Sequence, residues 1–476
     1  MGLELKNRML VWLAAAVGGY VLLNIAIVAV LVADGDSVSN AYKATAPAYT
    51  KNLLQPSRND SWKPMLTAYN RHIENPSGDM YAVFFDEHVK FQYPPTSLVA
   101  FDFLPRSLST LDNGEVGLPL LLALGKISRV IVILTAILSA VVLEIGRRRL
   151  NPLKPVHPVS TIASLLLSCA LGLAFYPLQK AHWLGQVQVF LDAAVALAFL
   201  FHLLGWKASS GVCFGFCCLV KPQFGVVLLW SVLRRQWRFT LGLLALFVPG
   251  LIVSLWRFGL QNHLRYLDVM QTITRHGEAY WPNQSMNGLV NRLLGNGEAV
   301  DWSFTEFAPF HPVVYSLTVA SSLVILVLAL WPRKHWKTAS GGSIDLAAAV
   351  AAATIASPVA WEHHYGIFVP VVALLVPELI RTRPLGRVTA PLLLLAYLAM
   401  ANVLLRPRRL FSNGWFGLLG SHLFLGGIIV FGLLLVVRAH LRTAAVPAIA
   451  PPARGDTRRG VKDRGAGARG IAPPAD

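Results

Sequence analysis

The chain has 476 residues, of which 55% are hydrophobic, and its mean hydropathy is +0.53. This composition excludes a pair of soluble domains and indicates an all-helical polytopic membrane protein. The formal net charge of +18 does not point to nucleic acid, because many basic residues form short clusters between apolar runs, as at 147–149 and 234–238. Such clusters are typical of cytoplasmic loops facing anionic lipid headgroups.

With the N-terminus in the cytoplasm, the apolar runs predict about twelve transmembrane helices. The first follows Lys6 and Arg8 and is long enough to remain as a signal anchor. The expected spans are 9–33, 127–146, 158–177, 187–205, two short helices within 208–233, 239–256, 312–331, 344–358, 365–380, 388–405 and 416–437. Two long loops, 34–117 and 257–311, then face the outside and are expected to carry short amphipathic helices. The aromatic content of the first predicts that its helices pack on the membrane.

The two short helices in 208–233 are expected to form a hairpin hinged at Lys221-Pro222. A single span there would place Arg234 and Arg235 outside, against the positive-inside rule. Proline disfavours helix in the preceding residue and removes a backbone donor. Lys221 would then lie at or just below the outer surface.

The C-terminal part of the sequence predicts an outer loop and a tail. Arg406, Arg408 and Arg409 would lie outside. Either the number of spans before them differs from this count, or they bind an anion, or they reach the lipid headgroups by snorkelling. Residues 1–442 are expected to form the membrane domain, and 443–476 a disordered, basic, cytoplasmic tail.

The polar strings of interest all fall on the outer face. Asp34 and Asp36 follow the first span, either as ordinary helix-end acids or as a general base. The string FQYPP (91–95) carries Tyr93 and stiffens the chain. Lys221 lies in an apolar run, so it is expected to face an anion or water. Gln186, in the preceding outer turn, is either a ligand donor or satisfies a helix end.

Two further strings, NQSMNGLVNR (283–292) and SPVAWEHHYG (357–366), follow in the second half of the chain. Asn283, Gln284 and Arg292 suit a hydroxyl-rich or anionic ligand, although Asn-Gln-Ser is also an ordinary helix start. Arg275 precedes them and is a further candidate for an anion site. In the second string, the spacing of Glu362, His363 and His364 does not fit a metal site, and the histidines suit a phosphate better than zinc.

Together these strings resemble glycosyltransferase family 87, membrane enzymes of the GT-C superfamily that use polyprenyl-phosphate-linked sugars, typically mannose. The matching features are an acid after the first span, FQYPP, GQVQ (185–188), Lys221-Pro222, NQS with Arg292, and SPVAWEHH. The resemblance extends from about residue 30 to 365. It implies the GT-C fold and an inverting transfer to a hydroxyl of a glycolipid or glycan acceptor, without metal or other cofactor.

The resemblance also assigns roles. The base is Asp36, with Asp34 as second choice. The donor phosphate is held by Lys221, His363, His364, Arg292 and Arg275, and the sugar or acceptor by Asn283, Gln284, Tyr93, Gln186 and Glu362. One departure is that the family's aspartate is followed closely by aromatics, whereas Asp36 is followed by five residues before Tyr42. Asp86 and Glu87 are therefore rival carboxylates.

The implied place of action is the extracytoplasmic face of a bacterial inner membrane, with both termini cytoplasmic. Three alternatives remain open at the level of sequence: a flippase or exporter of lipid-linked sugars, another GT-C-like polymerase or ligase, and an inactive relative acting as a scaffold. A transporter is expected to show internal repeats and charges at the bilayer midplane, which this sequence does not display.

Overall fold

The computed structural model describes residues 2–112, 114–149, 157–303, 306–331, 339–381, 386–404 and 415–440. The chain divides into two units, Met1–Leu441 and Arg442–Asp476. The predicted tail lies outside the described residues, as do Arg406, Arg408 and Arg409.

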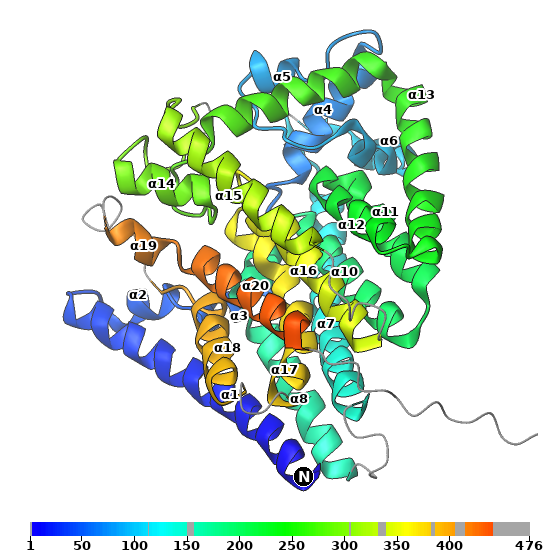
Figure 1. The fold of residues 1–476 in the computed structure, drawn as a ribbon. Coiled ribbons are helices and arrows are strands. Elements are labelled where there is room, and N and C mark those ends of the chain that lie inside the picture. The colour runs from blue at the N-terminus through cyan, green and yellow to red at the C-terminus, as the bar shows by residue number, and fades with distance from the viewer. Residues whose placement is uncertain are drawn as a thin grey trace, which may run out of the picture. The chain divides into compact units, whose positions relative to one another are not determined.

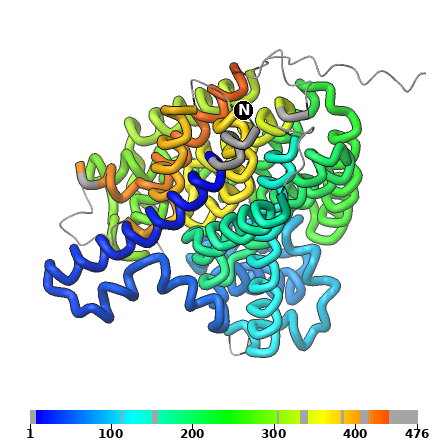
Figure 2. The backbone as a smooth tube through the Cα atoms, turned by 90° about the horizontal axis from the view of Figure 1, so that it is seen from below, coloured from blue at the N-terminus to red at the C-terminus, as the bar shows by residue number. Residues whose placement is uncertain are grey.

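Helices packed in a bundle build most of the first unit (Figure 1). They are α1 (Gly2–Ala33), α7 (Leu118–Arg149), α8 (Pro158–Ala174), α9 (Tyr176–Leu184), α10 (Gln188–Leu204), α11 (Lys207–Val220), α12 (Gly225–Leu233), α13 (Trp237–His276), α15 (Pro312–Leu330), α16 (Ala339–Ile355), α17 (Phe368–Arg381), α18 (Gly386–Ala401) and α20 (His422–His440). Figure 2 shows α1 along the edge of the bundle, where it packs against α8 and α18.

Short elements occupy the connections, as the sequence predicts for the first long loop. They are α2 (Val38–Lys43), α3 (Ala46–Asn52), α4 (Trp62–Glu74), α5 (Ala82–Phe85), α6 (Arg106–Ser109), α14 (Met286–Leu294), α19 (Phe416–Gly420) and the 3-10 helices η1 (Pro95–Phe103), η2 (Pro222–Phe224) and η4 (Glu362–Ile367). Strands β1 (Leu111–Asp112) and β2 (Glu115–Val116) pair antiparallel.

The structure confirms a multi-pass helical membrane protein but does not establish twelve spans. Among the described residues, six helices are long and apolar enough to cross a membrane, or seven if α8 and α9, bent by 51°, form one span. The other apolar helices have 10–17 residues, fewer than the roughly 20 that a bilayer requires. Each predicted span contains an apolar helix, so the number that cross remains a prediction.

The predicted break at Lys221-Pro222 is present. α11 ends at Val220, and Lys221 adopts an extended conformation with φ −137° and ψ 98°. Proline explains the break, because its ring disfavours helical geometry in the residue before it.

The packing of α11 on α13 shows that the chain reverses after this break. A side-chain carbon on Gly211 would meet the backbone of Phe239, and one on Gly215 would meet that of Leu243. Because the contacts advance in the same direction along both helices, α11 and α13 run parallel, and α12 between them must run back. The small residues allow this close approach of two backbones. The predicted hairpin is confirmed.

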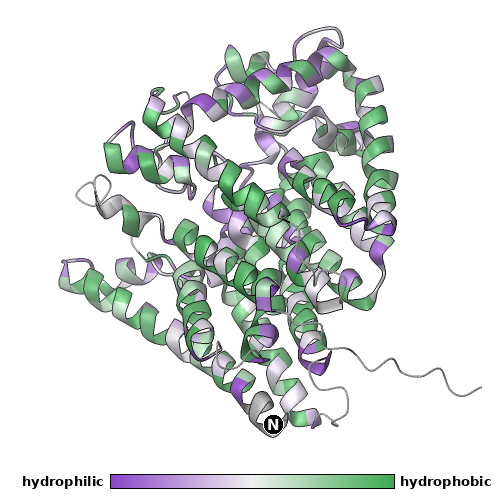
Figure 3. Cartoon of the chain, viewed as in Figure 1, coloured by the Kyte–Doolittle hydropathy of each residue, from purple (hydrophilic) through white to green (hydrophobic). Residues whose placement is uncertain are grey.

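Helix α13 extends further than the sequence indicates. Its span ends near Gly259, where φ 73° and ψ 156° interrupt the helix, close to the predicted end at 256. The second arm, residues 260–276, then turns across the end of the bundle (Figure 1). This arm, α4 and α14 mix hydrophilic and hydrophobic residues, whereas the bundle helices are mostly hydrophobic (Figure 3).

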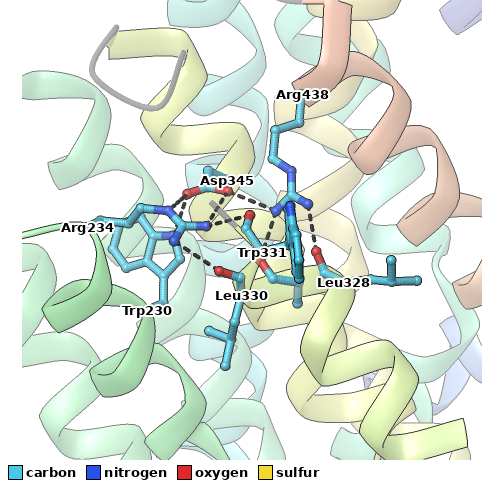
Figure 4. Close-up of polar contacts among 8 residues, drawn as sticks. Trp230, Arg234, Leu328, Leu330, Trp331, Asp345 and Arg438 are labelled. Carbon is cyan, nitrogen blue, oxygen red and sulfur yellow. Dashed lines mark hydrogen bonds and ion pairs between the residues drawn. The ribbon is translucent and has the colours of Figure 1, made fainter. Parts of the chain in front are cut away.

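A buried charge cluster holds several helices of the bundle together (Figure 4). Asp345 accepts hydrogen bonds from Arg234 Nε at 2.6 Å, Arg438 Nη1 at 2.9 Å and Trp230 Nε1 at 2.8 Å. The two guanidinium groups also donate to the last carbonyls of α15, those of Leu328, Leu330 and Trp331. The cluster therefore joins α12, α15, α16 and α20 and satisfies a helix end that lacks intrahelical partners.

Candidate functional site

The segment 58–61 lies against the turn that joins α9 to α10. The backbone N–H groups of Arg58 and Asp60 donate to the carbonyls of Trp183 and Leu184, both at 3.0 Å. Gly185 in this turn has φ 72°, and a side-chain carbon there would come within 1.8 Å of the Arg58 carbonyl oxygen. Glycine is thus required both by the left-handed backbone and by the close approach.

The side chain of Gln186 connects this segment to the FQYPP string. Its Nε2 donates to Asp60 Oδ2. Its Oε1 accepts from Ser61 Oγ at 2.6 Å and from the Tyr93 hydroxyl at 3.3 Å, and the two hydroxyls are 2.8 Å apart. One glutamine therefore positions the Asp60 carboxyl relative to two distant parts of the chain.

Asp60 is exposed to solvent as a residue, but protein atoms surround its carboxyl group. The residue is exposed, yet the protein atoms around its carboxyl raise the pKa by desolvation, against the opposing effects of Gln186, Lys180 and Arg58. A carboxyl in such a recess, with a raised pKa and access to solvent, is suited to general base catalysis. The sequence reasoning missed it; the available signal was an aromatic residue, Trp62, two positions later.

The second glutamine of GQVQ lies beside Lys221. Lys221 Nζ donates to Gln188 Oε1 at 2.7 Å, and Gln188 Nε2 donates to Asp192 Oδ1 at 2.8 Å. Lys221 is only 7% exposed. Asp192 packs against Gly366, where a side-chain carbon would come within 2.0 Å of Oδ2. This contact brings the segment after the paired histidines to the lysine.

His363 and His364 stand edge to face, with ring centroids 4.7 Å apart. Both lie close enough to Lys221 for its charge to act on them. No hydrogen-bond partner is found for either imidazole among the described residues. The described parts of the chain also contain no group of three or more His, Cys, Asp or Glu side chains placed to hold a metal ion. Lys221 and the two histidines thus form a cationic or donor-rich group suited to an anion.

Glu362 is buried beside this group. Its Oε2 accepts from the Tyr176 hydroxyl at 2.9 Å and lies 3.9 Å from Lys180 Nζ. Its Oε1 is buried without a hydrogen-bond partner among the described residues. A buried acceptor of this kind is costly to leave unpaired.

The NQS string pairs with the backbone of SPVAWEHH. Asn283 Oδ1 accepts from Ala360 N at 3.0 Å, and Asn283 bridges to Trp361 in an antiparallel arrangement. Gln284 Nε2 donates to the carbonyls of Trp281 and Gly420, at 2.8 and 2.7 Å. Both amides are fully buried. The Asn283 side chain supports the 357–364 segment, whereas the Gln284 side chain joins this loop to the start of α20, since its Oε1 accepts from Leu423 N at 3.1 Å.

Arg292 has a comparable position. Its Nη1 donates to the carbonyls of Ala279 at 3.2 Å and Asn283 at 3.1 Å, and its Nη2 donates to Ser421 Oγ at 2.7 Å. The side chain is only 1% exposed. Arg292 therefore holds the loop that precedes Asn283.

The remaining predicted residues lie elsewhere. Asp34 and Asp36 follow the end of α1, which Figure 1 shows far from α4, the helix that begins two residues after Asp60. Arg275 lies over the Phe310 ring at 5.6 Å, in a groove of about 570 Å³ between α13 and α15. Of the rival carboxylates, both exposed, Glu87 pairs with Arg71. The structure thus gathers Tyr93, Gln186, Lys221, Glu362, His363 and His364 and leaves these others apart.

The fold and this cluster define a multi-pass membrane protein with a polar, charged site at one end of its helices. The profile of glycosyltransferase family 87 matches residues 91–358, more than half of the chain. The chain therefore belongs to glycosyltransferase family 87, as the sequence motifs indicated, and is a membrane glycosyltransferase. A search of the curated proteins found no match.

Proposed function

We propose that the protein moves a sugar, expected to be mannose, from a polyprenyl-phosphate donor to a hydroxyl of a lipid or glycan acceptor. One observation carries this proposal: two glutamines at the junction of α9 and α10 position a carboxyl and an ammonium group from other parts of the chain. Gln186 bonds Asp60, and Gln188 bonds Lys221. A transfer from a phosphate ester requires both groups, one for the entering hydroxyl and one for the leaving phosphate.

The phosphate end of the proposed site is Lys221 with His363 and His364. The leaving phosphate gains negative charge as its bond to the sugar breaks, and donors fixed around it stabilise that charge in the transition state. Lys221 is positioned by Gln188 before any substrate binds, so little reorganisation is needed.

The proposed base is Asp60 in place of Asp36 or Asp34. Its carboxylate accepts the proton of the acceptor hydroxyl, and the hydroxyl oxygen forms the new bond to the anomeric carbon. The bond from that carbon to the phosphate oxygen breaks, and polyprenyl phosphate leaves with the electron pair. One displacement from the opposite face inverts the anomeric configuration.

The proposed location is the extracytoplasmic face of a bacterial inner membrane. Helix α12 runs from the Lys221 break toward Arg234, and the triple arginine 147–149 ends α7. Basic residues prefer the cytoplasmic side, which supports a site on the outer side with both termini inside.

The test is transfer of label from radiolabelled polyprenyl-phosphate mannose by the purified protein in lipid, with a membrane extract as acceptor. Transfer is expected for the wild type and for the Asp36→Asn and Asp34→Asn variants, and loss for Asp60→Asn. Polyprenyl-phosphate glucose and arabinose test the donor sugar. An Asp60→Asn variant with wild-type transfer would contradict the base, and no transfer from any of the three donors would contradict the function.

A further inference from the structure

Three aromatic side chains from three separate segments meet beside the site. The Trp302 ring lies 5.3 Å from Tyr280 and 5.3 Å from Trp361, and Tyr280 and Trp361 are 6.4 Å apart, centroid to centroid. All three side chains are half-buried. Tyr280 follows α13, Trp302 precedes α15 and Trp361 precedes η4, so the group depends on the tertiary fold and not on a local sequence pattern.

A partly buried ion pair supports this group from behind. Lys90 Nζ lies 4.1 Å from the centroid of the Trp302 ring and bonds Glu278 Oε1 at 2.6 Å and the Glu306 carbonyl at 2.8 Å. The side chains of Lys90 and Glu278 are 10% and 6% exposed. Aromatic rings that merely anchor a protein at the membrane interface need no such support. The ion pair fixes the rings and joins the FQYPP loop to the second outer loop.

The aromatic group borders the polar cluster. Trp361 is adjacent in the chain to Glu362, whose Oε1 is buried without a partner among the described residues. The Tyr280 hydroxyl is near several acidic groups: burial raises its pKa to about 12, and the charges of Glu362 and Asp60 add to this effect. An aromatic surface thus lies next to the residue that carries an unpaired acceptor, within electrostatic reach of the proposed base.

This combination has the chemistry of a sugar subsite. The face of an aromatic ring carries partial negative charge, and it attracts the C–H groups that a pyranose presents on one face. The hydroxyls around the same pyranose require acceptors such as a carboxylate oxygen. An apolar face next to an unpaired carboxylate oxygen satisfies both needs.

We propose that Tyr280, Trp302 and Trp361 form a platform on which a hexopyranose ring stacks, with Glu362 Oε1 accepting a hydrogen bond from one of its hydroxyls. This inference rests on the proposed function and identifies a contact of its substrate. The pyranose belongs either to the donor or to a sugar unit of the acceptor, and the chemistry of recognition is the same.

The direct test is ¹⁹F NMR of the full chain in lipid nanodiscs, labelled with 5-fluorotryptophan. Trp302→Phe and Trp361→Phe assign the two signals, and Trp256, 84% exposed on α13, provides a control signal. The probes are polyprenyl-phosphate mannose, polyprenyl phosphate and octyl α-mannopyranoside. A shift of both signals with polyprenyl-phosphate mannose but not with polyprenyl phosphate places the donor sugar on the platform. A shift with the octyl mannoside alone indicates an acceptor sugar. If neither signal shifts with either sugar-bearing probe, the proposal is overturned.

Kinetics supply a second readout. For the substrate whose sugar the NMR places on the platform, Trp302→Leu should raise KM about tenfold with little change in kcat. Trp302→Phe should keep most of the affinity, and Trp256→Leu should match the wild type. An unchanged KM in Trp302→Leu contradicts the platform. If transfer is at the wild-type rate but neither tryptophan signal shifts with any probe, the platform alone is refuted. If the signals shift with octyl mannoside but no transfer occurs, the proposed function alone is refuted.

Discussion

Lys221 and Gln188 are joined by a hydrogen bond of 2.7 Å between the break that ends α11 and the first residue of α10. Gln188 in turn donates to Asp192, one turn further along α10. The amide therefore lies between a buried cation and a buried carboxylate and orients both. Two roles for Lys221 follow from this arrangement. It balances the charge of Asp192, and in the proposed reaction it stabilises the leaving phosphate.

Replacing Lys221 should test these roles. Lys221→Gln is expected to lower kcat by about 100-fold or more, because a fixed positive group at the departing phosphate is lost. It should also lower the melting temperature, since Asp192 loses its nearby cation. The double variant with Asp192→Asn should recover the melting temperature but not kcat. Lys126→Gln, exposed on α7, is the control. Recovery of both quantities in the double variant would reduce Lys221 to a structural role.

Gln186 should control the pH dependence through Asp60. Burial raises the pKa of Asp60, and the bond from Gln186 opposes that rise. Activity is expected to fall as the pH drops through this raised pKa, because a protonated carboxyl accepts no proton. Gln186→Met removes the opposing bond, so the acid limb of kcat/KM should move to higher pH. Gln261→Met, on the exposed surface of α13, should leave the limb in place, and a shift to lower pH in Gln186→Met would contradict the assignment.

The fold could be predicted from the sequence wherever a local signal was sufficient. Apolar runs located the helices, and Pro222 located the break, because proline acts on its immediate neighbour. The number of spans could not be settled, because several apolar helices are too short to decide by length. The second arm of α13 was predicted only as part of an outer loop with short amphipathic helices, since an amphipathic helix lying across the bundle lacks a continuous apolar run.

The site was predictable only in part. Lys221 stood out because a charge is costly within apolar sequence, and it lies in the observed cluster. Asp60 did not stand out, because a carboxylate is ordinary in a polar loop and its partner Gln186 is 126 residues away. Asn283 and Gln284 have the composition of a ligand site, yet they bond the backbone. Composition cannot separate these two uses of an amide.

Asp345 should contribute mainly to stability. It is fully buried and pairs with Arg234 and Arg438. Asp345→Ala leaves two arginines without this counter-charge, and a loss of about 3–5 kcal/mol is typical of such a change. The melting temperature in detergent should fall clearly, with kcat of the remaining folded enzyme retained. Asp268→Asn, which breaks a half-exposed pair with Arg265, should cost less than about 1 kcal/mol. Equal losses in the two variants would contradict the role of the buried cluster.

Gly185 and Gly205 allow the site and the backbone to be tested separately. Both end a helix with a left-handed residue, at φ 72° and φ 86°. Alanine at either position should cost about 1 kcal/mol in backbone strain. At Gly205 nothing lies within 4 Å of the added carbon, whereas at Gly185 it would meet the Arg58 carbonyl.

Both alanine variants should lose stability, Gly185→Ala more than Gly205→Ala because of this clash, but only Gly185→Ala should lose activity per folded enzyme. Gly185→Ala must displace the 58–61 segment and with it Asp60, and a shift of about 1 Å in a reacting group costs on the order of 100-fold in rate. Gly205→Ala should keep the wild-type kcat. The measurements are single-turnover transfer from polyprenyl-phosphate mannose and thermal unfolding of both variants. If kcat falls equally in both, general destabilisation explains the loss, and the segment 58–61 does not set the rate.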